Sequence, residues 1–193
     1  MIGIFILAAG ESKRFGGLKL LVNLCGRPLI SYSVEAALAA GVGSVYVVVG
    51  REAREIAAAL RGVEVGVIYN PWFRQGLSSS LKAAVLSAPR LDGYVVALGD
   101  MPLVRPQTYR DLVKHLGEAP IIAPTYKGRR GNPVLLDRRA LPHILTLEGD
   151  IGARALLGAL RVSYVEVDDP GVLIDIDEPD DLAEASRAIC NEY

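Results

Sequence analysis

The sequence predicts an α/β protein with an open, doubly wound, mostly parallel sheet between two layers of helices. Six apolar segments rich in β-branched residues recur along the chain, at residues 2–7, 44–49, 63–69, 94–98, 121–123 and 162–167. Most are continuous apolar runs, which is typical of parallel strands covered on both faces. Helical patterns separate them at residues 29–40, 52–60, 80–88 and 108–116. This alternating order predicts a Rossmann-like three-layer α/β/α fold with right-handed crossovers.

The alternation breaks near residue 120. The stretch PTYKGRRGNPVLLDRRALPHIL, residues 124–145, combines a short strand, a basic glycine-containing turn and a second apolar segment. We therefore expect a short antiparallel excursion beside the main sheet. Because no internal repeat, low-complexity tract or linker interrupts the chain, residues 1–193 are expected to form a single domain.

Composition excludes several classes of protein. The chain has 193 residues, of which 51% are hydrophobic and 22% charged, so it is expected to fold and bury a core. A net charge of −1 provides no overall basic field for binding nucleic acid. The apolar run at residues 2–9 is too short for a signal segment or a bilayer span, and no membrane partner is expected. The cysteines, Cys25 and Cys190, have no paired spacing, so we expect no disulfide, no cysteine metal site and a cytoplasmic protein.

A glycine-rich loop follows the first predicted strand, in the stretch ILAAGESKRFGGLKLL at residues 6–21. Glycines allow backbone N–H groups to approach an anion closely, and Arg14 and Lys19 could bond phosphate oxygens. The spacing fits neither the GxGxxG dinucleotide motif nor the GxxxxGK motif followed by Ser or Thr. The loop is therefore either a nucleotide site of another kind or an ordinary turn with solvated charges.

Asp100 is a candidate metal ligand because it follows a buried strand in YVVALGDMPLV, residues 94–104. Since neighbouring parallel strands end at the same edge of a sheet, we expect it close to Gly10. A carboxylate beside a phosphate loop suits Mg²⁺ that bridges phosphates. The alternative is a β-turn aspartate that accepts backbone hydrogen bonds.

A second candidate ligand lies near the C-terminus, in VLIDIDEPDDLAEA at residues 172–185. Asp175 and Asp177 share one face of an extended segment, so Asp177 could join Asp100 on a metal. Alternatively, the acidic residues belong to a helix start in which Pro179 occupies the first turn. Both alternatives remain open at this point.

Three further loops are candidates for substrate contacts. In NPWFRQGLSSSLKAA, Gly76 could approach a nucleobase, while one of the serines at 78–80 is expected to cap the next helix. In YKGRRGNPV, the basic turn around Arg129 and Arg130 could bind an anionic second substrate or be a solvated hairpin. In EGDIGARALL, Asp150 is expected mainly as the N-cap of a helix that begins near residue 151. His115 and His143 have no ligand pattern around them and receive no chemical role.

Together these motifs resemble a known family. LAAGESKRFGGLKLL is similar to the LAAGxSxRxGxxKL signature of nucleotidyltransferases with a glycosyltransferase-A-like fold, and LGDMPLV, GNPVLL, GDIGARALL and DIDEPDDL follow in that family's order. The matching blocks span residues 4–182. LAAG, GDMP and GDxGAR look most like the molybdenum cofactor cytidylyltransferase branch of the MobA-like NTP transferases. The resemblance implies the nucleotide-diphospho-sugar transferase type of α/β fold.

The resemblance also implies roles for individual residues. Arg14 and Lys19 would hold the triphosphate and stabilise the transition state, and Asp100, with Asp177, would hold Mg²⁺. Contacts to the nucleotide would come from Leu7, Ala8, Ala9, Gly10 and Ser80. The loops themselves add Gly76 as a candidate nucleotide contact, and Arg129, Arg130, Asn132 and Asp150 as candidate acceptor contacts.

The expected reaction is transfer of CMP from CTP to the molybdopterin cofactor, with release of pyrophosphate. A molybdoenzyme or its chaperone would be a further protein partner. Alternatives are a guanylyltransferase, a sugar-phosphate or alditol-phosphate nucleotidylyltransferase, or a non-catalytic nucleotide-binding or cofactor-binding protein of the same fold.

Overall fold

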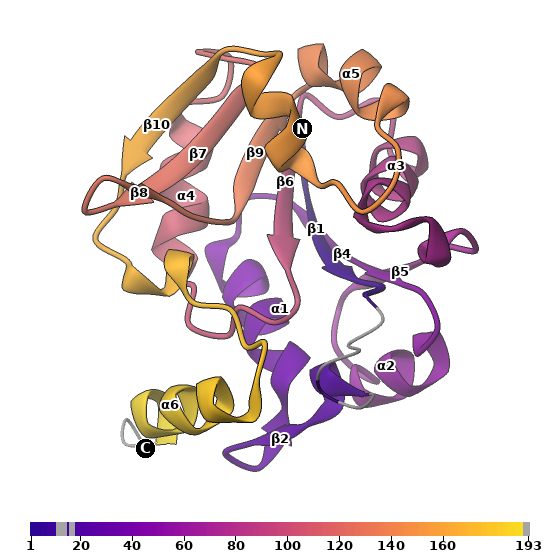
Figure 1. Cartoon of the computed structure of the whole chain (residues 1–193), viewed down its shortest axis with the longest axis vertical. Coiled ribbons are helices and arrows are strands. Elements are labelled where there is room, and N and C mark those ends of the chain that lie inside the picture. Colours follow the sequence, from indigo (N-terminus) through magenta and orange to yellow (C-terminus); the bar gives the residue numbers. More distant parts are fainter. Residues whose placement is uncertain (11–14, 16–17, 191–193) are drawn as a thin grey trace.

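The computed structural model describes residues 1–10, 15 and 18–190. Its main sheet has the strand order β10-β7-β9-β6-β1-β4-β5, with β8 paired to β7 (Figure 1). The strands are β1 Ile2–Ala8, β4 Ser44–Val49, β5 Gly66–Tyr69, β6 Gly93–Leu98, β7 Ile121–Tyr126, β8 Arg129–Arg130, β9 Val134–Asp137 and β10 Val162–Glu166. A separate hairpin consists of β2 Asn23–Leu24 and β3 Arg27–Pro28.

Helices cover both faces of this sheet, as the sequence predicts. The α-helices of the described residues are α1 Leu29–Ala40, α2 Ala53–Ala59, α3 Leu77–Ser87, α4 Pro106–Lys114, α5 Leu141–Thr146 and α6 Pro179–Cys190. Short 3₁₀ helices occur at η2 Lys19–Leu21, η3 Phe73–Gln75, η4 Arg138–Ala140, η5 Ala153–Gly158 and η6 Pro170–Leu173. No helix of the described residues is long and apolar enough to cross a membrane.

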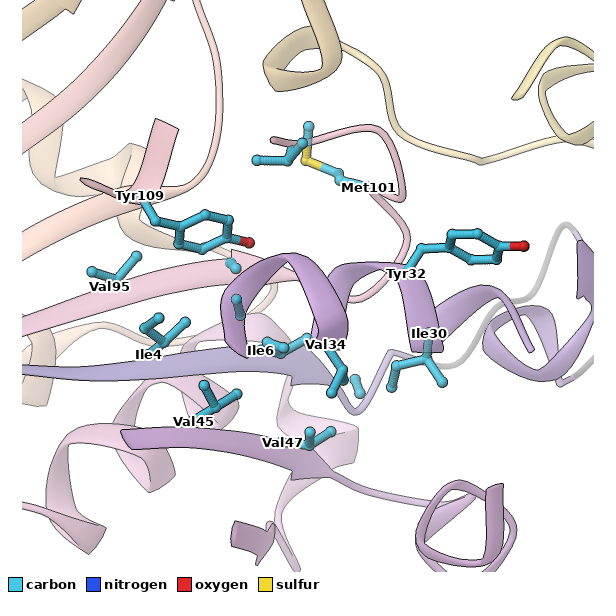
Figure 2. Packing of buried hydrophobic residues seen from close by; sticks show 14 of the residues in the cluster. Ile4, Ile6, Ile30, Tyr32, Val34, Val45, Val47, Val95, Met101 and Tyr109 are labelled. Carbon is cyan, nitrogen blue, oxygen red and sulfur yellow. The ribbon is translucent and has the colours of Figure 1, made fainter. Parts of the chain in front are cut away.

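The central strand β1 shows why the fold has three layers. Side chains of a strand alternate between its faces, so Ile4 and Ile6 pack with α1, α2 and α4, whereas Phe5 and Leu7 pack with α3 and α5. Figure 2 shows the first of these cores, where Ile6 lies beside Val34 of α1. Because β1 apolar residues are buried on both sides, the continuous apolar run at the N-terminus forms a central strand.

The parallel strands β4, β1 and β6 align so that their carboxyl ends meet. Leu7 of β1 is in register with Val48 of β4 and with Leu98 of β6. The loops that follow β1 and β6 therefore begin at neighbouring points of one sheet edge. This register is the feature of the fold that positions the candidate site.

The antiparallel excursion occurs, but its position differs from the expectation. β9 is not beside the main sheet: it lies between β6 and β7 and is antiparallel to both. β7 therefore remains parallel to β6, and β10 pairs parallel with β7. The apolar sequence of β9 explains this position, since all four of its residues are buried.

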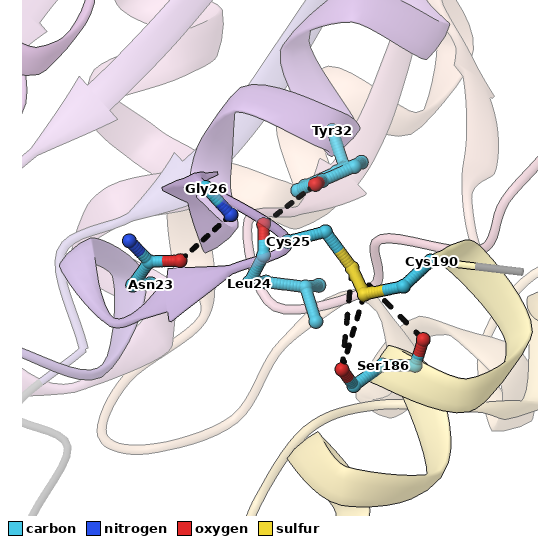
Figure 3. Close-up of a disulfide and its surroundings, with 7 residues drawn as sticks. All are labelled: Asn23, Leu24, Cys25, Gly26, Tyr32, Ser186 and Cys190. Atoms are coloured by element: carbon cyan, nitrogen blue, oxygen red, sulfur yellow. Dashed lines mark hydrogen bonds between the residues drawn. A yellow bond between two sulfur atoms is a disulfide. The ribbon is translucent and has the colours of Figure 1, made fainter. Parts of the chain in front are cut away.

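A disulfide joins Cys25 to Cys190, so the expectation of no disulfide is wrong. Cys25 occupies the turn of the β2–β3 hairpin with Gly26, and both have positive φ angles, as a two-residue type I′ turn requires. Cys190 ends α6, which Figure 3 shows packed against this hairpin. The cysteines are 165 residues apart, and only the tertiary fold brings them together. With a disulfide present, cysteine usage no longer indicates the cytoplasm.

Candidate active site

A cleft of about 790 Å³ opens at the carboxyl ends of β1 and β6. This is the edge at which open α/β sheets bind their ligands. Its lining comes from five segments that are distant in sequence: the end of β1 with η2, the segment from η3 to α3, and the stretches at 98–100, 149–150 and 177. The described lining residues are Leu7, Ala8, Ala9, Gly10, Phe15, Lys19, Leu20, Phe73, Arg74, Gln75, Gly76, Leu77, Ser80, Leu98, Asp100, Gly149, Asp150 and Asp177.

The end of β1 forms the floor of the cleft. Leu7 to Gly10 line it, in agreement with the position expected of the LAAG motif. The Gly99 amide donates to the Leu7 carbonyl at 3.0 Å and so fastens the loop after β6 to the end of β1. Arg14, the second predicted phosphate ligand, lies outside the described residues.

Lys19 connects the two predicted metal ligands. Its ammonium group lies 2.7 Å from Asp100 Oδ2 and 3.0 Å from Asp177 Oδ1. The lysine side chain is only 10% exposed, whereas those of Asp100 and Asp177 are 22% and 48% exposed. Burial alone would lower the pKa of Lys19, but the charges and hydrogen bonds of Asp100 and Asp177 outweigh it and raise the pKa above its ordinary value. Lys19 therefore carries a positive charge at the cleft.

One contact holds the segment around Asp177 in place, and a different residue satisfies the start of the helix that follows it. The Ile176 amide donates to the Asp100 carbonyl at 2.9 Å, which aligns the segment before α6 with the loop after β6. Asp181 caps α6, because its Oδ2 accepts from the amides of Asp177 and Glu178. The side chain of Asp177 is thus directed to Lys19 while Asp181 satisfies the helix start. Of the two alternatives that the sequence left open, the helix start is formed by Asp181, and the metal role of Asp177 stays a prediction.

Asp175 adds a third carboxylate to this region. Burial raises the pKa of Asp175 above its usual range, and the negative charges of Asp177 and Asp100 raise it further, against the opposing effect of Lys19. The region is therefore rich in negative charge, which Lys19 partly neutralises.

The opposite wall consists of η3 and the start of α3, which begins one turn earlier than predicted. Gly76 precedes α3 with φ of 92°. A Cβ atom at this position would lie 2.6 Å from the backbone of Asp150, so the space that glycine leaves is taken by the 149–150 loop. Gly76 thus permits close approach of this loop while still lining the cleft.

The prediction that a serine and Asp150 cap the helices that follow them is wrong. Ser78, Ser79 and Ser80 lie inside the first turn of α3 instead of capping it, with Ser78 Oγ donating to the Gly149 carbonyl at 2.7 Å. Asp150 does not cap the segment that follows it. Its Oδ1 accepts from the Leu77 amide at 3.1 Å and so satisfies the N-terminus of α3. The contact between the 149–150 loop and the start of α3 decides the positions of both the serines and Asp150, and local sequence does not specify this contact.

The other predicted acceptor residues lie apart from the cleft lining. Arg129 and Arg130 form β8, which pairs with the end of β7. The Asn132 amide donates to the Val172 carbonyl of η6 at 2.9 Å. These residues are at the carboxyl edge of the sheet, but β9 and β6 separate β7 from β1.

Sequence reasoning missed the contribution of η3. Phe73, Arg74 and Gln75 line the cleft, and Arg74 and Lys19 are the cationic residues among its described lining. The available signal was their position, since they connect a strand to a helix in a segment that also holds Gly76. The prediction for this segment rested on Gly76 and the serines and did not include these larger side chains.

Comparison with known proteins places the chain in a family. The MobA-like NTP transferase domain matches residues 4–165. The chain belongs to this family. This is the family that the sequence motifs resemble, and the fold class is confirmed by related structures.

Relatives cover the chain to different extents. The purine catabolism protein PucB of Bacillus subtilis is 30% identical, covering 98% of this chain and 97% of its own length. The molybdenum cofactor cytidylyltransferase of Escherichia coli is 28% identical, covering 96% of each chain. The bifunctional protein GlmU of Agrobacterium fabrum is 42% identical over 53% of this chain, which spans only 24% of that relative.

Solved structures share the whole architecture. A nucleotidyl transferase of Methanothermobacter thermautotroptrophicus has a TM-score of 0.86 at 28% identity, covering 100% of this chain and 99% of its own. Rv0371c of Mycobacterium tuberculosis in complex with manganese has a TM-score of 0.83 at 26% identity, covering 97% and 99%.

Proposed function

We propose that this MobA-like enzyme transfers CMP from CTP to the molybdopterin cofactor and releases pyrophosphate. The observation that carries the proposal is the ion cluster of Lys19, Asp100 and Asp177 at the edge of the LAAG floor. A lysine and two carboxylates beside a nucleotide loop supply the charges that phosphoryl-group chemistry needs. The whole-length similarity to the cytidylyltransferase of Escherichia coli supports the choice of base and acceptor.

The reaction requires little acid–base chemistry from the protein. A phosphate oxygen of the acceptor attacks the α-phosphorus of the nucleotide in line, a new P–O bond forms, and the bond to the β-phosphate oxygen breaks. The leaving pyrophosphate takes the bonding electron pair. Because the attacking phosphate is already anionic, catalysis depends on position and charge. In the proposal Lys19 supplies positive charge to the phosphates, and the backbone from Leu7 to Gly10 holds the nucleoside.

The carboxylates of Asp100 and Asp177 fit Mg²⁺ as the cofactor. Mg²⁺ is usually held by one or two carboxylates together with substrate phosphates, and both carboxylates already share one cation, the Lys19 ammonium. When bound, Mg²⁺ would neutralise charge on the phosphates. The manganese in the related Rv0371c structure supports a divalent cation in this fold.

For the acceptor, we assign the η3 side of the cleft. Arg74 lines it and offers a cation that could pair with the acceptor's phosphate, while Asp150 and Gly76 shape the adjoining wall. Ser80 also lines the cleft and stays proposed as a nucleotide contact. Arg129, Arg130 and Asn132 would contact only an acceptor that extends beyond the cleft lining toward β7.

The test measures pyrophosphate release from each of the four NTPs with molybdopterin cofactor and Mg²⁺. We expect turnover with CTP, and Lys19→Ala should lower kcat by about 30- to 1,000-fold, equivalent to about 2–4 kcal/mol of transition-state stabilisation. Lys114→Ala is the matched control, because Lys114 also pairs with an aspartate, Asp111, but on the exposed surface of α4.

Several outcomes separate the alternatives. Turnover only with GTP, or only with a sugar phosphate or alditol phosphate, would replace the base or acceptor while leaving the chemistry intact. Binding of nucleotide without pyrophosphate release from any acceptor would indicate a non-catalytic protein. Near-normal kcat in Lys19→Ala would refute the role given to Lys19.

A further inference from the structure

We infer that Lys19 closes the cation site in the ligand-free protein and opens it only when a triphosphate draws the ammonium group away. The inference deepens the proposed function and rests on it, because it takes Asp100 and Asp177 as the ligands of the cation. It adds an order of binding: the divalent cation enters with the nucleotide and binds poorly before it.

The first step is the position of the ammonium group. Its nitrogen lies 2.7 Å from Asp100 and 3.0 Å from Asp177, so it bridges carboxylates from two separate segments. Mg²⁺ requires oxygen ligands at about 2.0–2.1 Å. A cation that contacted the same two oxygens would occupy the space that Lys19 Nζ fills. The lysine and the metal therefore exclude each other at these atoms.

The second step concerns the stability of the closed arrangement. Hydrogen bonds between ionised partners are among the strongest in proteins, and Lys19 makes two of them in a largely buried position. A divalent cation must break both bonds before it can bind, so the lysine weakens binding of the cation by itself.

The third step is the release of the lysine. Lysine has a long, flexible stem that can redirect its ammonium group, and Lys19 lines the cleft where the phosphates would bind. A bound triphosphate offers Lys19 new anionic partners and offers the cation additional oxygen ligands. Both exchanges occur together, so each ligand strengthens binding of the other, as thermodynamic linkage requires.

The test measures binding of Mn²⁺ in the absence of nucleotide, by electron paramagnetic resonance of the free ion. We expect Lys19→Met to bind Mn²⁺ about tenfold or more tightly than the unaltered protein, because the ammonium group no longer bridges the carboxylates of Asp100 and Asp177. The matched control Lys114→Met removes an exposed lysine that also pairs with an aspartate, and it should leave Mn²⁺ affinity unchanged. The double variant Lys19→Met with Asp100→Asn should lose the gain.

A second measurement follows the coupling. A non-hydrolysable CTP analogue should tighten Mn²⁺ binding to the unaltered protein by a larger factor than in Lys19→Met. Lys19→Gln serves as a second variant if Lys19→Met fails to fold, as judged by its circular dichroism spectrum.

The outcomes distinguish this inference from the proposed function. Equal or weaker Mn²⁺ binding in both folded Lys19 variants would overturn the inference, even if the unaltered enzyme releases pyrophosphate normally. If no variant bound Mn²⁺ at Asp100 and Asp177 even with the analogue, the cation site itself would be refuted, and with it the proposed function as stated.

Discussion

The disulfide between Cys25 and Cys190 should contribute a large part of the protein's stability. It closes a loop of 165 residues, and closing a loop of this length in the unfolded chain lowers its entropy. The chain-entropy relation gives about 5 kcal/mol at 25 °C, while measured disulfides more often give about 2–4 kcal/mol. Since about 1 kcal/mol shifts the melting temperature of a protein this size by about 2–4 °C, reduction should lower it by about 5–15 °C.

The perturbation is either a reductant or the variant Cys25→Ser with Cys190→Ser. Cys25 and Cys190 are both exposed, so a reductant can reach the bond. Serine is a suitable replacement because it is close in size and needs no further change in the β2–β3 turn. Thermal unfolding by calorimetry, together with alkylation of free thiols and intact mass, measures both stability and redox state.

Equal melting temperatures for the reduced protein and the double serine variant would show that the lost stability comes from the cross-link. Each single variant should have the same melting temperature as the double variant, because either substitution removes the disulfide. A melting temperature that reduction lowers by less than about 2 °C would refute the reasoning. So would alkylation of both cysteines in the folded protein without reductant.

Three further substitutions test local features. Burial alone would raise the pKa of Asp137, but the hydrogen bonds and charge of Arg139 hold this pKa below its usual value. Asp137→Asn should therefore lower the free energy of unfolding by about 1–2 kcal/mol near neutral pH, as measured by urea unfolding. That difference should disappear as pH falls through the lowered pKa, and a difference that persists in acid would contradict the ion pair. Gly76→Ala should destabilise the protein by about 1–3 kcal/mol more than Gly62→Ala, because Gly62 has a similar φ but open space around it. Equal effects of the two substitutions would refute the predicted overlap with the 149–150 loop. Asp150→Ala should cost about 1 kcal/mol in thermal unfolding, as expected for a lost helix cap, and Asp150→Asn should restore most of it.

Much of the fold could be predicted because local pattern and packing agree. α1 and β4 begin and end at the predicted residues, since α1 is bounded by Pro28 and Gly41 and β4 is a continuous β-branched run. The start of α3 was missed by one turn because its N-terminus is satisfied by Asp150, a residue remote in sequence. The position of β9 was missed because sequence alone did not say which strands it would pair with.

The same distinction applies to the candidate site. That Gly10 and Asp100 meet follows from two neighbouring parallel strands, and the structure brings both into one cleft. That Lys19 binds Asp100 and Asp177 directly was not predicted, because the motifs gave each residue a separate role. The part played by Arg74 was also missed, since it follows from the position of η3 against the 149–150 loop.

By itself, the sequence determined the α/β class, the family and the edge of the sheet at which the cleft opens. These depend on apolar periodicity, on turn residues and on motifs, all of which are local properties of the chain. Only the tertiary structure decided which distant groups meet: Cys25 with Cys190, Asp150 with the start of α3, and Lys19 with two carboxylates. Such pairs form because burial of the core fixes their segments side by side, and no spacing along the chain specifies that placement.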